Sequence, residues 1–188
     1  MLKDVLAISL ISATSTISAQ QMSVEFDPAK TQIHWSLAGN VHTTHGTFRF
    51  KQGHVSVNPA TGVMSGDLVA DATSGDSGNG ARDKRMNKEI LEAEKYPEFR
   101  FTPQKLEGPV TPGAHSNVHV IGTFLVHGST HNLTIPMDLT VANGIVTGSG
   151  KFSIPFVDWG MKDPSNFLFK VDKSVEVEVE AVGTVTSK

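Results

Sequence analysis

The stretch VEVEVEA, residues 175–181, decides the fold class of this 188-residue chain. Valine or alanine stands at every second position, and Glu176, Glu178 and Glu180 stand between them. Because successive strand residues point to opposite faces of a sheet, this segment has one apolar and one wet face, as in an antiparallel sheet. The three carboxylates on one face predict a solvated surface that protects a sheet edge, rather than an acid–base site.

The same two-residue period recurs along most of the chain, and turn residues separate the repeats. NPATG at residues 58–62 and Asn143-Gly144 predict hairpin loops, and DPSN at residues 163–166 predicts a further turn. About eight strands with regular turns favour a β-sandwich or a closed barrel. The alternation is seen in residues 33–38, 48–50, 64–72, 99–101 and 133–139.

The segment ARDKRMNKEILEAEKYPEFRF, residues 81–101, departs from this pattern. Asp83 or Asn87 is expected to cap a short helix, and Pro97 returns the chain to strand. We therefore predict one or two helical turns, laid on the sheet or across a barrel mouth. The pair Arg82-Asp83 could bind an anionic group, but a helix cap with a local ion pair is the simpler interpretation. The apolar face of the helix is expected to carry Met86, Ile90 and Leu91.

Composition narrows the function classes. With 38% hydrophobic and 19% charged residues, the chain is expected to form one globular domain. A formal net charge of −3 gives no general attraction to nucleic acid or to anionic membranes. The absence of cysteine excludes disulfides, thiolate metal sites and cysteine nucleophiles.

The N-terminus has the features of a secretory signal. Lys3 precedes an apolar run, and small residues lead up to Ala19. We predict a signal peptide over residues 1–19, a mature domain over residues 20–188, and a periplasmic or secreted location. The apolar run is shorter than the about 20 residues that a membrane-spanning helix needs.

Aromatic residues recur at positions where a strand face should point inward. A phenylalanine-rich inner face is usually ordinary core, but an eight-stranded barrel is also wide enough to hold one small ligand. The pattern leaves both interpretations open. The residues concerned are Trp35, Phe48, Phe50, Phe99, Phe101, Phe124, Phe152, Phe156, Phe167 and Phe169.

The eight histidines do not form a recognisable metal motif. His42 and His45, and likewise His127 and His131, are spaced three and four apart in segments that read as turns, without an H-E-x-x-H pattern. We interpret them as surface or turn residues and expect no metal. No nucleophile elbow, P-loop or dinucleotide-binding glycine motif occurs, so we expect no catalytic residue and no cofactor.

Five motifs in order resemble those of the YceI-like family, the polyisoprenoid-binding, lipocalin-like proteins. The resemblance covers residues 24–186. Members often carry an arginine shortly before the late aromatic–glycine pair, where this chain has SIPF at residues 153–156. The motifs are HTTHGTF (42–48), the segment 81–101, VIGTFLVHGSTHNLTIPMDL (120–139), FVDWGMKDP (156–164) and VEVEVEAVG (175–183).

The resemblance implies an all-β fold, an eight-stranded antiparallel lipocalin-like β-barrel with a short helical insert. It implies an apolar tunnel for a long isoprenoid lipid, of the polyprenyl or quinone type, and no catalysis. Arg82 and Asp83 are expected to fix the helix against the barrel, with contact to a lipid head group as the second option. The expected tunnel residues are Trp35, Phe48, Phe50, Phe99, Phe101, Phe124, Phe152 and Phe156.

Two other function classes stay open. One is a metal-dependent hydrolase that uses the histidine-rich turns. The other is a filled barrel that serves as a stress-related interaction module, whose signature is an interior without a cavity. The expected partner is an isoprenoid lipid and not nucleic acid, and the resemblance leaves open a transient membrane contact and a homodimer.

Overall fold

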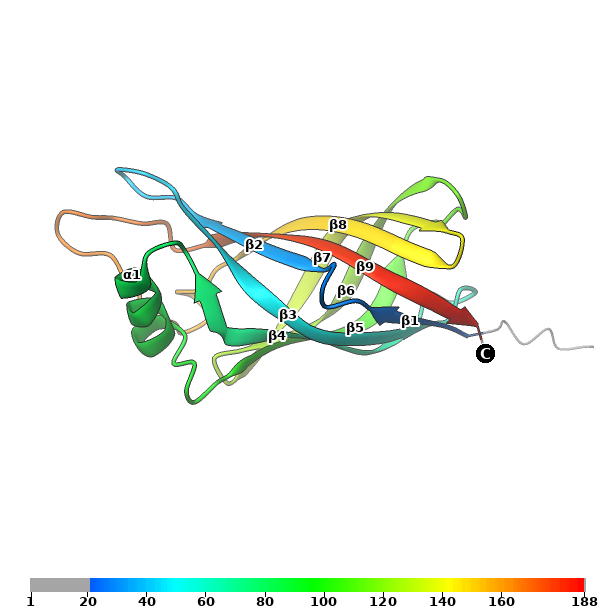
Figure 1. Cartoon of the computed structure of the whole chain (residues 1–188), viewed down its shortest axis with the longest axis horizontal. Coiled ribbons are helices and arrows are strands. Elements are labelled where there is room, and N and C mark those ends of the chain that lie inside the picture. Colours follow the sequence, from blue (N-terminus) through cyan, green and yellow to red (C-terminus); the bar gives the residue numbers. More distant parts are fainter. Residues whose placement is uncertain (1–20, 188) are drawn as a thin grey trace, which may run out of the picture.

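The computed structural model describes residues 21–187, so the predicted signal peptide lies outside the described residues. These residues form an elongated barrel, with α1 at one end and the C-terminus at the other (Figure 1). The elements are β1 (Met22–Phe26), β2 (Gln32–Leu37), β3 (Thr44–Val57), β4 (Met64–Asp76), α1 (Gly80–Arg85), η1 (Met86–Ile90), β5 (Glu98–Glu107), β6 (His115–Val126), β7 (Ser129–Ala142), β8 (Ile145–Ile154) and β9 (Val175–Ser187).

The barrel closes because β1 and β2 are two halves of one broken strand. Both pair antiparallel with β3 on one side and with β9 on the other. The pairing of β3 with β4 completes the circuit, which gives nine strands in eight positions. The predicted eight-stranded antiparallel barrel is therefore confirmed, and the sandwich alternative is wrong.

The break between β1 and β2 has a local cause at Asp27. The Asp27 side chain accepts a 2.9 Å hydrogen bond from the Ala29 N–H. The backbone carbonyl of Asp27 accepts another from the Thr31 N–H at 3.0 Å. Pro28, between them, has no N–H to offer a neighbouring strand. The chain therefore leaves the barrel wall in a turn after β1. It then re-enters the wall as β2, in the same position between β3 and β9.

The β9 strand shows the alternation that the sequence predicts. Its inward residues Val175, Val177, Val179 and Ala181 line the barrel interior. Exposed Glu178 and Glu180 lie on the outer face. The prediction of an edge strand is wrong, because β9 pairs with β8 on one side and with β1 and β2 on the other. A closed barrel has no edge for these carboxylates to protect.

Both predicted hairpins are confirmed. Asn143 and Gly144 have φ of 52° and 74°, as a type I′ turn between β7 and β8 requires. Between β3 and β4, the Asn58 side chain accepts from the backbone N–H groups of Ala60 and Thr61, and Gly62 has φ of 70°. Glycine and asparagine suit these turns because both adopt a left-handed backbone more readily than other residues do. An asparagine side chain can also accept hydrogen bonds from backbone N–H groups two or three residues later.

The helical insert consists of one α-helical turn and one π-helical turn between β4 and β5. Its cap is Asn79, whose side chain accepts from the Arg82 N–H at 3.2 Å, so the predicted capping by Asp83 or Asn87 is wrong. The return to strand after Pro97 is confirmed, since β5 begins at Glu98. Within residues 21–187, no helix has the length and apolar character needed to cross a membrane.

Candidate functional site

The barrel encloses a cavity of about 1090 Å³ that extends along its length. Every strand contributes lining residues, and so do the loops at both ends. Ile135 and Met137 on β7 are only half-buried although they point inward, because they border open space rather than close-packed core. The filled-barrel alternative is therefore wrong. The volume matches or exceeds the roughly 300–1,000 Å³ that is usual for small-molecule pockets.

All eight predicted tunnel residues line this cavity; their contact with a ligand stays a prediction. The aromatic rings form a wall in which Phe48 and Phe99 meet edge to face, with ring centroids 5.0 Å apart. Phe156 is 6% exposed and packs with Ile90 of η1, so it also belongs to the core under the helix. The lining residues of this set are Trp35, Phe48, Phe50, Phe99, Phe101, Phe124, Phe152 and Phe156.

Three aromatic residues expected on strands lie in the loop between β8 and β9, and of these Phe156 still lines the cavity from a turn. Phe167 and Phe169 were expected on a strand with an inward face, but they lie in the loop between β8 and β9. Phe167 is 94% and Phe169 is 55% exposed. Their spacing of two resembles strand alternation, but Asn166 imposes a turn on this segment, as the hydrogen bonds described below show.

The two ends of the cavity differ in charge. At the end near the Asn58–Gly62 hairpin, the cavity is bordered by uncharged residues, including Pro59, Pro109 and Val110. At the other end, which we call the α1 mouth, it is bordered by Arg82, Arg85, Lys170, Asn40 and His42. Among the described residues that line the cavity there is no aspartate or glutamate.

Arg82 and Asp83 both contact Ser77, just after β4. The Arg82 guanidinium donates to the Ser77 hydroxyl at 2.7 Å and to the Ser77 carbonyl at 2.9 Å. The Asp83 carboxylate accepts from the Ser77 N–H at 3.0 Å and from its hydroxyl. This geometry fits a role in holding α1 on the barrel. Of the two side chains, only Arg82 also lines the cavity.

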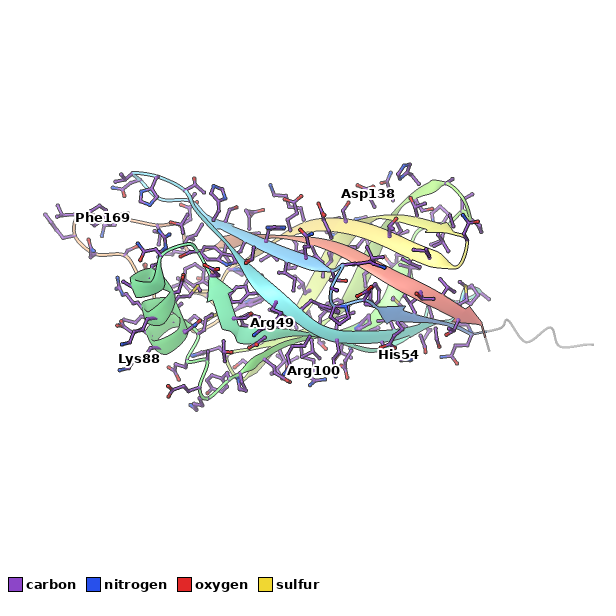
Figure 2. The ribbon with its side chains drawn as sticks, in the orientation of Figure 1. Arg49, His54, Lys88, Arg100, Asp138 and Phe169 are labelled. Atoms are coloured by element: carbon purple, nitrogen blue, oxygen red, sulfur yellow. The ribbon has the colours of Figure 1, made fainter. Side chains whose placement is uncertain are left out.

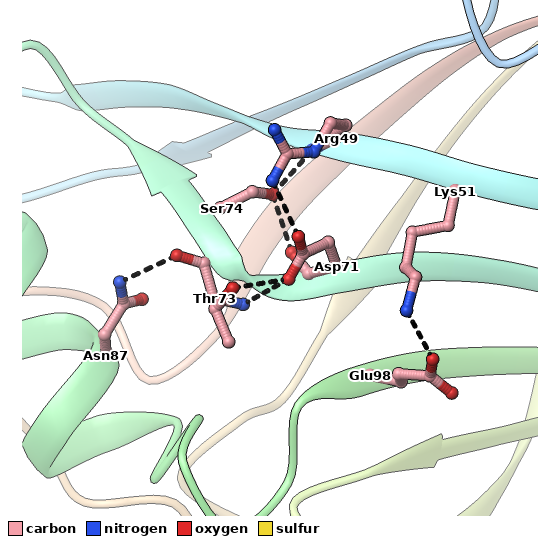
Figure 3. A network of polar contacts seen from close by, with 7 residues as sticks. All are labelled: Arg49, Lys51, Asp71, Thr73, Ser74, Asn87 and Glu98. Carbon is pink, nitrogen blue, oxygen red and sulfur yellow. Dashed lines mark hydrogen bonds and ion pairs between the residues drawn. The ribbon is translucent and has the colours of Figure 1, made fainter.

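A polar network on the outside of the barrel holds the insert from its other side (Figure 3). The Asn87 side-chain amide donates to the Thr73 carbonyl at 3.1 Å, and the Thr73 side chain donates to Asp71 at 2.6 Å. Arg49 on β3 pairs with the same carboxylate at 2.7 Å.

These contacts change the pKa of Asp71. Burial alone would raise this pKa, but the hydrogen bonds from Thr73 and Arg49 outweigh burial and hold the pKa of Asp71 below its ordinary value. The carboxylate therefore stays charged to a lower pH than an ordinary aspartate. It links β3 to the part of β4 that contacts the helical insert.

The histidines do not assemble a metal site in the described part of the chain. His127 occupies a turn with φ of 49°, with its Nε2 3.5 Å from Glu92, while His131 stacks on Trp159 with ring centroids 4.1 Å apart. The placement of His45 and His131 in turns is wrong, because they lie on β3 and β7. Between residues 21 and 187, no three His, Asp or Glu side chains converge to hold a metal ion. The metal-hydrolase alternative thus finds no donor set there.

Comparison with known proteins gives a family match over most of the chain. The model of the YceI-like domain matches residues 24–183. No curated protein sequence matches the chain.

Solved structures share the fold at low sequence identity. BcnA of Burkholderia cenocepacia is 22% identical with a TM-score of 0.71, over 85% of this chain and 99% of that one. A polyisoprenoid-binding domain from Saccharophagus degradans, implicated in plant cell wall breakdown, is 15% identical with a TM-score of 0.67, over 87% and 98%. The YceI protein of Campylobacter jejuni is 14% identical with a TM-score of 0.53, over 100% and 91%.

Proposed function

The chain belongs to the YceI-like family, and from this premise we propose that it binds a long isoprenoid lipid inside the barrel. It would sequester or carry the lipid in the periplasm or outside the cell, without catalysing a reaction. The observation that carries this proposal is the apolar cavity that extends through the barrel. A solved relative named a polyisoprenoid-binding domain supports the same class of ligand.

The shape of the cavity suits a long, extended ligand rather than a compact one. The longest strands, β3 and β7, have 14 residues each, and so extend roughly 45 Å along their own axes. A tilted barrel of such strands encloses a correspondingly long interior. Transfer of a lipid tail from water into this interior stabilises the complex by roughly 0.8 kcal/mol per CH₂ group, with no polar contact needed along the tail.

The charge at the α1 mouth favours an anionic head group. Arg82, Arg85 and Lys170 border the cavity there, and no carboxylate borders it among the described residues. Guanidinium and ammonium groups form strong, charge-assisted hydrogen bonds to phosphate, but gain less from a neutral quinone ring. We therefore favour a polyprenyl phosphate over a quinone, with its tail toward the uncharged end.

Native mass spectrometry of protein expressed with its N-terminal segment tests the proposal. We expect a lipid of isoprenoid mass to co-purify and to be recovered by organic extraction. The delipidated protein should bind a polyprenyl phosphate more tightly than the polyprenol of the same chain length, and more tightly than an isoprenoid quinone. If no lipid co-purifies and none of the three binds, the proposed function is wrong. The same spectra report whether the protein is a homodimer.

A further inference from the structure

The loop between β8 and β9 presents a run of exposed apolar side chains. Phe167, Leu168 and Phe169 are 94%, 68% and 55% exposed, and Val41 in the neighbouring loop is 64% exposed. Phe169 lies at the α1 end of the molecule, on the loop that projects there (Figure 2). We call residues 167–169 the apolar tip. Three consecutive large apolar residues in water are unfavourable for a soluble protein unless they serve contact with another surface.

Hydrogen bonds within the protein hold the apolar tip in a defined conformation. The Asn166 side chain accepts from the N–H groups of Leu168 and Phe169 at 2.9 and 2.8 Å, and the Asn166 N–H donates to the Phe169 carbonyl. The Leu168 carbonyl accepts from the Asn40 side chain at 3.2 Å. The backbone N–H and carbonyl groups of Leu168 and Phe169 thus have partners within the protein. This is the condition for placing a loop in an apolar medium, where each unpaired group is unfavourable.

The apolar tip is continuous with the rim of the cavity. Phe169, Lys170 and Val41 all border the α1 mouth. The loop that carries Val41 is tied to the tip by Asn40, whose side-chain oxygen accepts from the Lys170 N–H at 3.0 Å. A surface that covers the tip would therefore also face the opening through which a lipid enters the barrel.

The charge around the apolar tip complements an anionic surface. The helical insert and the β8–β9 loop, residues 80–90 and 155–174, contain seven lysines or arginines and five aspartates or glutamates. These segments thus have a formal net charge of +2, whereas the rest of the chain, with nine basic and fourteen acidic residues, has −5. A second copy of the chain would bring the same cationic end and repel it, whereas anionic lipid head groups would attract it.

We propose that the apolar tip docks the α1 mouth onto the surface of an anionic lipid bilayer. Phe167, Leu168 and Phe169 enter the boundary between head groups and acyl chains, as aromatic and leucine side chains of interfacial proteins do, while Lys170 and Arg85 face the head groups. Lipid can then pass between the bilayer and the cavity without crossing water. The purpose of docking rests on the proposed function, but docking itself does not require that the cavity hold an isoprenoid.

Flotation with vesicles tests docking directly. The mature chain is mixed with vesicles of phosphatidylcholine and phosphatidylglycerol, and separately with pure phosphatidylcholine. We expect the wild type to float with the anionic vesicles, and the triple variant Phe167→Ser, Leu168→Ser, Phe169→Ser to bind them at least about a hundredfold more weakly, because three apolar side chains no longer leave water. The matched control replaces two isolated exposed residues far from the mouth, Val63→Ser and Ile145→Ser, and should float like the wild type.

A fluorescent probe separates insertion from simple adhesion. Because the chain has no cysteine, Leu168→Cys and Ile145→Cys each give one site for an environment-sensitive dye. We expect anionic vesicles to shift the emission of the dye at position 168 to the blue and to leave that at position 145 unchanged.

The outcomes separate docking from cargo binding. Docking is overturned if the wild type stays unbound, if the triple variant floats like the wild type, or if the dye at position 168 does not respond. It is equally overturned if the triple substitution abolishes a dimer instead of vesicle binding. If vesicles bind but delipidated protein takes up no isoprenoid in detergent solution, docking stands and the proposed function fails.

Discussion

Arg82 donates two hydrogen bonds to Ser77, from Nε to the hydroxyl oxygen at 2.7 Å and from Nη2 to the carbonyl oxygen at 2.9 Å. Ser77 follows the last residue of β4, and Arg82 lies in the single turn of α1. The contact therefore fixes the direction in which the chain leaves the barrel and begins the helix. Asp83 strengthens it, because its carboxylate accepts from both the N–H and the hydroxyl of Ser77.

We expect Arg82→Ala to lower the free energy of unfolding by about 1–3 kcal/mol, since Ser77 loses a charged donor at a half-buried position. Arg82→Lys should recover only part of this, because an ammonium group cannot contact both oxygens in the same forked geometry. Urea denaturation measures the difference. Exposed Lys84 of the same helix supplies the control, as Lys84→Ala should change stability by less than about 0.5 kcal/mol. Equal midpoints for Arg82→Ala and Lys84→Ala would show that the contact between Arg82 and Ser77 does not stabilise the fold.

A larger side chain at one position on β7 can occupy part of the cavity. Ile135 lines the cavity and is half-buried, whereas its neighbour Thr134 is exposed on the outer face. We expect Ile135→Trp to weaken binding of a polyprenyl phosphate by about tenfold or more, because the indole occupies space that two or more CH₂ groups of the tail would fill. Thr134→Trp adds the same ring outside the barrel and should bind normally. Titration in detergent solution gives both affinities, and unchanged binding by Ile135→Trp would place the lipid elsewhere.

Local chemistry explains which parts of this fold could be predicted from the sequence. Strict alternation at residues 175–181 and the Asn143-Gly144 turn depend on neighbours in the chain, and both appear as expected. Seven of the eight inward aromatic positions likewise follow from the period of two, whereas Phe156 lies in the turn after β8. The turn at Asp27 and Pro28 that separates β1 from β2 is local, but the shared strand position of β1 and β2 could not be predicted in this way, because it depends on the pairing of both with β3 and β9.

The candidate site was harder to predict, because it combines distant parts of the chain. Arg82, Arg85 and Lys170 meet at the α1 mouth only after β5 to β8 have brought the last loop back beside the insert. The exposure of Phe167 and Phe169 was missed because their spacing imitates a strand. The turn predicted at residues 163–166 was the available signal that a loop, rather than a strand, follows.

The preference for an anionic head group can be measured by reversing charge at the mouth. We expect the double variant Arg85→Glu, Lys170→Glu to bind a polyprenyl phosphate about tenfold to a hundredfold more weakly, because charge-assisted hydrogen bonds are replaced by repulsion. Binding of the polyprenol with the same tail should change little. The double variant Lys105→Glu, Lys151→Glu, at exposed positions on β5 and β8, serves as the charge-matched control. Equal losses of affinity for the polyprenyl phosphate and the polyprenol would show that the α1 mouth does not distinguish the two head groups.

The acid stability of the protein should depend on Asp71. Since its pKa is lowered in the folded state, the contribution of this carboxylate is complete above the ordinary pKa near 3.8 and disappears as pH falls through the lower folded-state pKa. At pH 7, Asp71→Asn should therefore reduce the free energy of unfolding by about 1–2 kcal/mol, because the ion pair with Arg49 is lost and a neutral amide oxygen accepts more weakly from Thr73.

The difference between wild type and Asp71→Asn should then narrow as pH falls from 5 toward 2, because protonation removes the same charge from the wild type. Denaturation curves at a series of pH values measure it, with exposed Asp138→Asn on β7 as the control that should follow the wild type. Because Asp71 and Thr73 also support Asn87 of the insert, hydrogen exchange should increase first in η1 of the Asp71→Asn variant. A pH-independent difference in stability would mean that the lost packing, and not the charge of Asp71, stabilises this junction.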